Sequence, residues 1–194
     1  MIHLVGPGGA GKSTIGAALA TRLGCPCCDL DREFERWRTN IDSFINVRGY
    51  ETYARENVAV YFEVAAQRPD AILVLSSGFM VYPRHVHAAY ETARTAIAES
   101  RTTVVLLPSF DREICVAETV RRQLGRPISH RGATREEAVI RDRFDRYMAL
   151  PAMKIETMRP ALDVAAVIHA RLAAEAPESL PMARRTHAPT HRAI

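Results

Sequence analysis

The feature that most constrains this chain is a glycine-rich stretch close to its N-terminus. Residues 6–14 read Gly-Pro-Gly-Gly-Ala-Gly-Lys-Ser-Thr, which fits the phosphate-binding pattern GxxxxGKS/T. An apolar run at residues 2–5 precedes this stretch, and Ile15, Leu19 and Leu23 follow it at the spacing of one helix face. The sequence therefore predicts a buried strand, a phosphate-binding loop and a helix in that order, rather than a glycine-rich turn without a ligand.

A loop of this kind binds phosphate through its backbone. Its N–H groups and the helix N-terminus hold a di- or triphosphate, so ATP and Mg²⁺ are the expected cofactors. We expect Lys12 to reach the β- and γ-phosphates as a catalytic group and the Ser13 hydroxyl to bind Mg²⁺. The expected nucleotide-binding residues are Gly8, Gly9, Ala10, Gly11, Lys12, Ser13 and Thr14.

Composition and length favour one globular domain. The chain has 194 residues, of which 47% are hydrophobic and 25% charged. No run is long enough to span a membrane, and we expect a cytoplasmic protein without a signal peptide. Three arginines and one glutamate in residues 176–194 carry half of the net charge of +4. We expect residues 1–175 to form the domain and residues 176–194 to be a disordered basic tail.

Apolar runs alternate with helical patterns along the rest of the chain. Further strands are expected at residues 27–30, 71–75, 102–107 and 153–157, with helices between them. Pro83 is expected in the first turn of a helix that runs to about Glu99. This alternation predicts an α/β fold, a three-layer α/β/α sandwich with a five-stranded parallel sheet and a mobile lid.

Ligands in such folds bind at the carboxyl ends of the strands. Polar residues follow three of the runs, at Asp29 and Asp31, at residues 76–78 and at residues 108–111. Asp29 and Asp31 alternate along a segment expected to be extended, so both can face the crevice. One carboxylate can hold Mg²⁺ through water, and the other can accept a proton from an acceptor hydroxyl. The alternative is a solvated acidic turn that caps the next helix.

The expected lid covers residues 121–135. Its central part, residues 125–134, is rich in Arg, Gly and Pro and carries Arg126 and Arg131. Such a segment can close over the phosphates and supply positive charge to the transition state, a role that we assign to Arg126. A solvated basic loop is the alternative.

Four cysteines include a CxxC spacing at Cys25 and Cys28. A zinc site needs a second pair of ligands, which the sequence does not offer. A redox pair stays open, but small buried thiols that enter a central strand are the favoured interpretation.

Together these motifs resemble shikimate kinase, a small P-loop kinase related to nucleoside monophosphate kinases. The resemblance extends over most of residues 1–175. Residues 29–31 resemble the D-x-D segment of that family, which implies that Asp29 helps to hold Mg²⁺ and that Asp31 touches the acceptor hydroxyls. Residues 126–128 resemble the R-P-L sequence of the lid.

The resemblance continues into the last third of the chain. Arg143 and Tyr147 match an R-x-x-x-Y helix, whose arginine binds the acceptor carboxylate in that family. Residues 155–157 and the Arg159-Pro160 turn resemble the segment beside the adenine, which implies that Arg159 contributes to nucleotide binding.

The chain departs from the family pattern on the acceptor side. The Gly-Gly-Gly loop of the family becomes Ser77-Gly78-Phe79, and we expect Ser77 and Gly78 to line the acceptor site. In the G-E-x-x-F-R segment the arginine position holds Ala54. The nearest arginine, Arg55, is displaced by one residue, a rotation of about 100° on a helix, and we expect it to contribute to acceptor binding.

The sequence thus predicts an ATP-dependent kinase for a small hydroxylated acceptor such as shikimate, a sugar acid or an antibiotic. Arg32, Arg36 and Arg38 around Trp37 leave a polynucleotide-end kinase as a less favoured alternative. A nucleotide-binding regulator without catalysis is a third, disfavoured by Asp31. We expect a monomer or weak dimer with no membrane or nucleic-acid partner.

Overall fold

A parallel sheet forms the centre of the protein. The structure is a computed structural model and describes residues 1–125 and 133–175. The sheet has five strands in the order β2-β3-β1-β4-β5. The strands are β1 (Ile2–Val5), β2 (Cys27–Asp29), β3 (Ile72–Val74), β4 (Thr103–Leu107) and β5 (Met153–Glu156). All neighbouring strands pair in parallel. This topology confirms the predicted α/β fold class and places β1, which leads into the glycine-rich loop, in the middle of the sheet.

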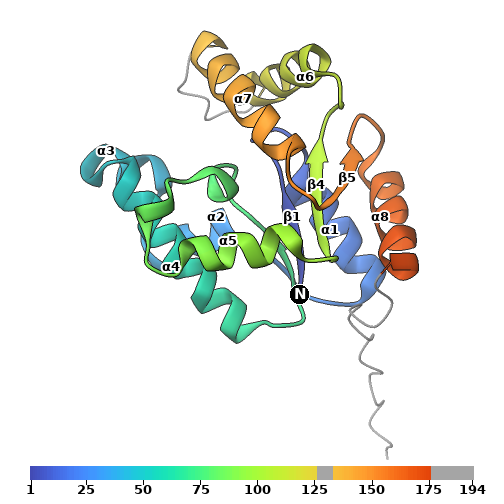
Figure 1. Ribbon diagram of the computed structural model, residues 1–194, viewed down its shortest axis with the longest axis horizontal. Coiled ribbons are helices and arrows are strands. Elements are labelled where there is room, and N and C mark those ends of the chain that lie inside the picture. The colour runs from blue at the N-terminus through green and yellow to red at the C-terminus, as the bar shows by residue number, and fades with distance from the viewer. Residues whose placement is uncertain (126–132, 176–194) are drawn as a thin grey trace, which may run out of the picture.

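Helices cover both faces of the sheet (Figure 1). Because alternate strand residues point to opposite faces, each face has its own core. Leu4, Val74 and Leu106 pack with α1 (Lys12–Leu23) and α8 (Ala161–Glu175). Leu73 and Val105 pack on the other side with α2 (Leu30–Trp37), α4 (Tyr50–Gln67) and α5 (Tyr90–Glu99). The short helix α3 (Ile41–Arg48) packs on α4.

Two helices stand above the carboxyl end of the sheet, α6 (Arg112–Leu124) and α7 (Ala133–Met148) (Figure 1). Ion pairs join them, between Arg112 and Asp145 and between Arg141 and Glu113, the latter at 2.6 Å. The expected lid therefore begins and ends in helices. Residues 126–132, with Arg126 and Arg131, lie outside the described residues, as does the expected tail at 176–194.

Local capping signals set the ends of three helices. The Asn40 side chain accepts a hydrogen bond from the Ser43 amide (3.2 Å) and so begins α3. Asp111 accepts one from the Ile114 amide (2.9 Å) and begins α6. Gly24 ends α1 in the left-handed conformation, with a φ of 65°.

The helix expected from Pro83 to Glu99 is wrong in its first half. The chain forms two short 3₁₀ turns, η1 (Phe79–Val81) and η2 (Arg84–Val86), and α5 begins only at Tyr90. Pro83 has a ψ of 141°, so it is extended rather than helical. The buried Tyr90 hydroxyl donates to the Phe79 carbonyl (2.5 Å) and accepts from the Tyr82 amide (3.1 Å). These tertiary bonds hold the segment in irregular turns.

All four cysteines are free thiols. Cys28 and Cys115 are buried, and burial raises the pKa of both thiols. Among the described residues there is no cluster of three or more potential metal-ligating His, Cys, Asp or Glu side chains. Burial of Cys28 agrees with a packing role, but the expected central strand is wrong, because β2 lies at the edge of the sheet, with Cys25 only partly buried and Cys27 exposed. No helix in the described part of the chain is long and apolar enough to cross a bilayer.

Candidate active site

The glycine-rich loop joins β1 to α1 and packs closely against its neighbours. A Cβ atom added at Gly6 would lie 2.2 Å from the carbonyl oxygen of Leu106 in β4. Gly6 has a φ of 147°, and Gly11, with a φ of 88°, is the N-cap of α1. The loop therefore directs the N-terminus of a twelve-residue helix at the strand-end crevice, where backbone N–H groups attract anions.

Lys12 lies within this loop. Its ammonium group donates to the carbonyls of Gly6 (2.8 Å) and Pro7 (2.9 Å), and the side chain is mostly buried. Of the other predicted loop residues, Ala10 is buried and Thr14 is exposed. The arrangement holds a positive charge at the centre of the phosphate-binding backbone.

A hydroxyl and a carboxylate meet at the start of α1. The Ser13 hydroxyl donates to Oδ2 of Asp29 at 2.5 Å. Asp29 ends β2, and its other carboxylate oxygen accepts the backbone N–H of Asp31 at 3.1 Å, which caps α2. Both groups offer the oxygen ligands that Mg²⁺ prefers, so they fit the predicted metal site.

Asp31 lies in the first turn of α2, not on an extended segment as the sequence predicted, because Asp29 caps the helix immediately after β2. Its carboxylate still faces the crevice. Oδ1 of Asp31 accepts from the hydroxyls of Ser76 (2.5 Å) and Tyr53 (3.4 Å). Burial, and then the charge of Asp29, raise the pKa of Asp31, whereas the Ser76 hydrogen bond and the charge of Lys12 lower it. The net direction is upward, which suits a proton acceptor.

Arg143 projects from α7 onto the loop after β3. Its guanidinium donates to the Ser77 hydroxyl (3.2 Å) and to the Tyr50 hydroxyl (3.4 Å). Tyr147, one turn later, donates to the Ser77 carbonyl (2.9 Å). Asp142, the residue before Arg143, binds Arg146 at 3.1 Å. In the described part of the chain the guanidinium thus contacts hydroxyl groups, which leaves its charge available for an anionic ligand.

Gly78 lies under two aromatic side chains of the same site. A Cβ atom added there would lie 2.5 Å from the Tyr50 hydroxyl and 2.8 Å from Cε1 of Tyr82. The structure therefore brings Ser77, Gly78 and Arg143 together beside Asp31, as the sequence predicted.

Comparison with known proteins decides the family. The family model for shikimate kinase matches residues 8–172. A shikimate kinase from Chromohalobacter salexigens is 35% identical over 144 residues, which are 74% of this chain and 72% of that protein. A shikimate kinase from Legionella pneumophila is 31% identical over 66% of each chain. The chain belongs to the shikimate kinase family.

Solved structures agree with this assignment. The shikimate kinase from Acinetobacter baumannii, solved in complex with shikimate, has a TM-score of 0.66 and 25% identity, over 89% of this chain and 92% of that one. A deoxyadenosine kinase from M. mycoides has a TM-score of 0.55 at 14% identity over 89% of this chain and 98% of that one, and shares the fold. The chain is accordingly an ATP-dependent kinase that phosphorylates a hydroxyl group of a small molecule.

Two predicted residues stay apart from the shikimate kinase site. Arg55 is exposed on α4, and Arg159 is exposed between β5 and α8. Neither forms a hydrogen bond or ion pair with the described residues that make up the site. Ala54, which stands at the arginine position of the family pattern, points into the core with no exposed surface. Arg55, one residue later, is therefore turned towards solvent instead.

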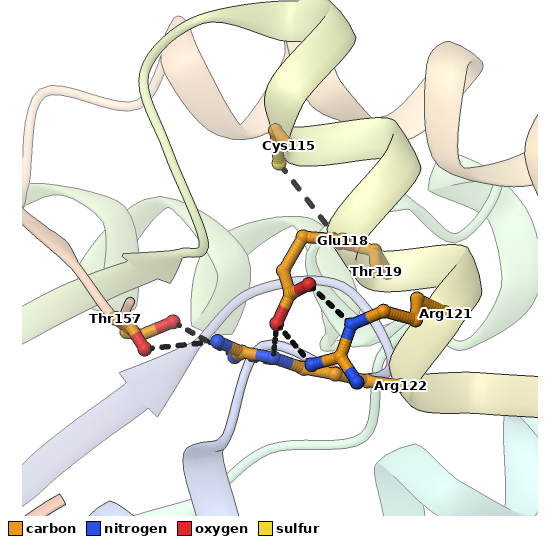
Figure 2. Close-up of polar contacts among 7 residues, drawn as sticks. Cys115, Glu118, Thr119, Arg121, Arg122 and Thr157 are labelled. Atoms are coloured by element: carbon orange, nitrogen blue, oxygen red, sulfur yellow. Dashed lines mark hydrogen bonds and ion pairs between the residues drawn. The ribbon is translucent and has the colours of Figure 1, made fainter. Parts of the chain in front are cut away.

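Sequence reasoning missed that Arg122 lies beside the phosphate loop (Figure 2). It donates to the Gly9 carbonyl (3.3 Å), to the Thr157 carbonyl (3.1 Å) and to Glu118 (2.6 Å). Hydrogen bonds from Arg121, and then from Arg122, lower the pKa of Glu118 to about 2. The sequence showed an arginine beside the lid, but only the fold shows that it joins α6 to the phosphate loop and to the segment after β5.

The hydroxyls of Ser76, Tyr53 and Tyr50 were also missed as partners of the predicted site. Ser76 carried a signal, since it directly follows the apolar run that contains β3. The two tyrosines carried no such signal, because helical spacing says nothing about where the hydroxyl groups point.

The basic segment behind the polynucleotide alternative is largely neutralised. Arg38 pairs with Glu56 and Glu63, both at 3.2 Å, and Arg36 lies 3.9 Å from Glu33. Trp37 is partly buried against the core. Two of the three arginines in this segment thus have carboxylate partners, which lowers the net positive charge that α2 and its C-terminal end offer to a nucleic-acid backbone.

Proposed function

We propose that this chain transfers the γ-phosphoryl group of ATP to a hydroxyl of shikimate or of a closely related hydroxylated acid. The observation that carries the proposal is the loop after β3. Its neighbouring residues Ser76 and Ser77 contact Asp31 and Arg143, respectively. A proton acceptor and a carboxylate-binding guanidinium therefore flank one site, beside the phosphate loop.

The nucleotide would bind along residues 8–14, with Lys12 at the β- and γ-phosphates. Ser13 would hold Mg²⁺ directly and Asp29 through water, which is consistent with their 2.5 Å contact. Mg²⁺, when bound, neutralises phosphate charge during transfer. Arg159 would contribute near the adenine, and Arg126 of the expected lid would contact the transferring phosphoryl.

Asp31 would accept the proton of the attacking hydroxyl as the oxygen–phosphorus bond forms. Its burial supports this role, because a raised pKa makes a carboxylate a stronger base. Arg143 would bind the acceptor carboxylate as a planar fork and so orient the hydroxyl towards the phosphate. The products are ADP and a phosphate ester.

The departures from the family pattern on the acceptor side make acids related to shikimate further candidate acceptors. Ala54, buried in the core, replaces the arginine of the family pattern, and Arg55 is exposed away from the cluster. An acceptor carboxylate would therefore depend on Arg143, which fits shikimate but also a sugar acid. Four free cysteines fit a reducing, cytoplasmic setting, and we retain a monomer or weak dimer.

An acceptor panel tests the proposal. ADP release would be measured with shikimate, a sugar acid, an aminoglycoside antibiotic and an oligonucleotide with a free 5′-hydroxyl. We expect release with shikimate, and Asp31→Asn should lower its turnover at least about a hundredfold while the affinity for an ATP analogue stays unchanged. Release with the oligonucleotide alone, or a full rate in Asp31→Asn, would contradict the proposal.

A further inference from the structure

The Asp31 carboxylate is held on one side only. Both hydroxyl donors, Ser76 at 2.5 Å and Tyr53 at 3.4 Å, contact Oδ1. Oδ2 has no hydrogen bond to a described residue. The two oxygens of one carboxylate thus have different surroundings, and only Oδ2 has its lone pairs unoccupied.

The two donors are rigid and come from different elements. Ser76 is 3% exposed and follows β3, whereas Tyr53 is 5% exposed and belongs to α4. Asp31 itself begins α2. The carboxylate is bonded by a residue that follows β3 and by a residue of α4, so it cannot rotate without losing a hydrogen bond. Its direction is therefore set by three parts of the fold, α2, α4 and the loop after β3.

We propose that Ser76 is a positioning residue for phosphoryl transfer, which acts with Tyr53 to hold Oδ1 of Asp31 and so present Oδ2 to the acceptor hydroxyl. This inference rests on the proposed function, in which Asp31 receives the proton. During transfer the acceptor O–H bond breaks, its proton passes to Oδ2, and the acceptor oxygen forms the new bond to phosphorus as the bond to ADP breaks.

The adjacent serine provides a natural contrast. The Ser77 hydroxyl contacts Arg143 and not Asp31. It should therefore affect the binding of the acceptor and not the position of the Asp31 carboxylate. Two consecutive serines therefore serve different steps. Removal of the Ser76 hydroxyl should lower kcat, and removal of the Ser77 hydroxyl should raise the acceptor KM.

A double-mutant cycle separates positioning from a packing role. The variants Ser76→Ala, Asp31→Asn and the combination of both would be assayed for ADP release with saturating ATP and shikimate. Since misplacement of a catalytic group costs up to about a hundredfold, we expect Ser76→Ala to lower kcat about tenfold or more, with the ATP KM within about twofold. In the Asp31→Asn background the same change should have almost no further effect.

Conservative variants keep the test valid if Ser76→Ala folds poorly. Ser76→Thr retains the hydroxyl and should recover most of kcat. Tyr53→Phe retains the ring, removes the longer of the two bonds and should lower kcat about threefold. Melting temperatures of all variants would be compared with that of the wild type.

The possible results separate two ideas. A normal kcat in Ser76→Ala beside an impaired Asp31→Asn would overturn the positioning role and leave the proposed function intact. An equal loss from Ser76→Ala in both backgrounds would also overturn it. A normal kcat in Asp31→Asn would instead overturn the base assignment, and with it the function proposed for Ser76.

Discussion

Two glycine-containing loops leave neighbouring strands and meet at the site, yet they are built in opposite ways. In the phosphate loop after β1, a Cβ added at Gly6 would meet a backbone carbonyl, that of Leu106, at 2.2 Å. In the loop after β3, a Cβ added at Gly78 would meet only side-chain atoms, the nearest being the Tyr50 hydroxyl at 2.5 Å. Gly6 has a φ of 147°, whereas Gly78 has an ordinary φ of −99°.

The difference explains why the nucleotide half of the site is common to many proteins, whereas the acceptor half is specific to each protein. The nucleotide half is made of backbone held in one shape, and backbone N–H groups bind any phosphate in the same way. The acceptor half is made of side chains, Tyr50, Ser77 and Arg143, which can be exchanged without changing the fold. Substrate choice therefore resides in the second half.

A pair of alanine substitutions tests this contrast directly. Gly6→Ala should cost at least about 3 kcal/mol of folding free energy, because it forces both a strained φ and a backbone clash. Gly78→Ala should cost less than about 1.5 kcal/mol, because the tyrosine side chains can move. It should raise the acceptor KM instead. Thermal unfolding and steady-state kinetics would measure the two effects, and equal losses of stability would break the comparison.

Removal of the charge in the nucleotide half should abolish activity without unfolding the chain. Lys12→Ala deletes the ammonium group held by the carbonyls of Gly6 and Pro7. We expect a loss of ADP release of about a thousandfold or more, the scale of a missing phosphate cation, at a melting temperature close to that of the wild type. Lys12→Met is a control of similar length. A variant that melts normally and still turns over ATP would contradict the assignment.

The sequence predicted the nucleotide half well, for a physical reason. A backbone-built loop needs glycines and a lysine at fixed spacing, so its pattern is local and readable. The positions of the five strands followed from equally local signals, the apolar runs along the chain.

The acceptor half depends on contacts between distant residues, which no local pattern encodes. Arg143 meets Tyr50 across 93 positions of the chain, and Ser76 meets Asp31 across 45. Even Asp31 was placed on the wrong element, although its role as a strand-end carboxylate was recognised. Tertiary packing also replaced the helix expected at Pro83 with short turns.

A smaller effect is expected from Arg143→Lys, which tests the side-chain half alone. A lysine keeps the charge but replaces a planar fork with a point donor, so it cannot bind a carboxylate in two places. We expect the acceptor KM to rise about tenfold, which corresponds to about 1.4 kcal/mol, and the ATP KM to stay within about twofold. Kinetics with both substrates would measure this. A rise in the ATP KM alone would assign Arg143 to the nucleotide, and a lower melting temperature with normal kinetics would assign it to the fold.

The smallest effect concerns a side-chain cluster beside the phosphate loop, Glu118 with Arg121 and Arg122 (Figure 2). Glu118 has a pKa lowered from 4.5 to about 2, so its stabilising effect is complete above the unfolded pKa and disappears as the pH falls towards 2. Because these pairs are partly exposed, Glu118→Gln should cost less than about 1 kcal/mol at pH 7, and this cost should shrink as the pH falls from about 4.5 through about 2.

Kinetics show whether this cluster also serves the nucleotide. Glu118 holds Arg122 against Gly9, so Glu118→Gln should raise the ATP KM about threefold and leave the acceptor KM unchanged. Glu113→Gln is the matched control, since Glu113 lies on the same helix and pairs with Arg141, away from the phosphate loop. An ATP KM that rises equally in both variants would show that the helix as a whole is responsible. A rise in Glu118→Gln alone would show that the backbone-built half relies on one side chain to hold its shape.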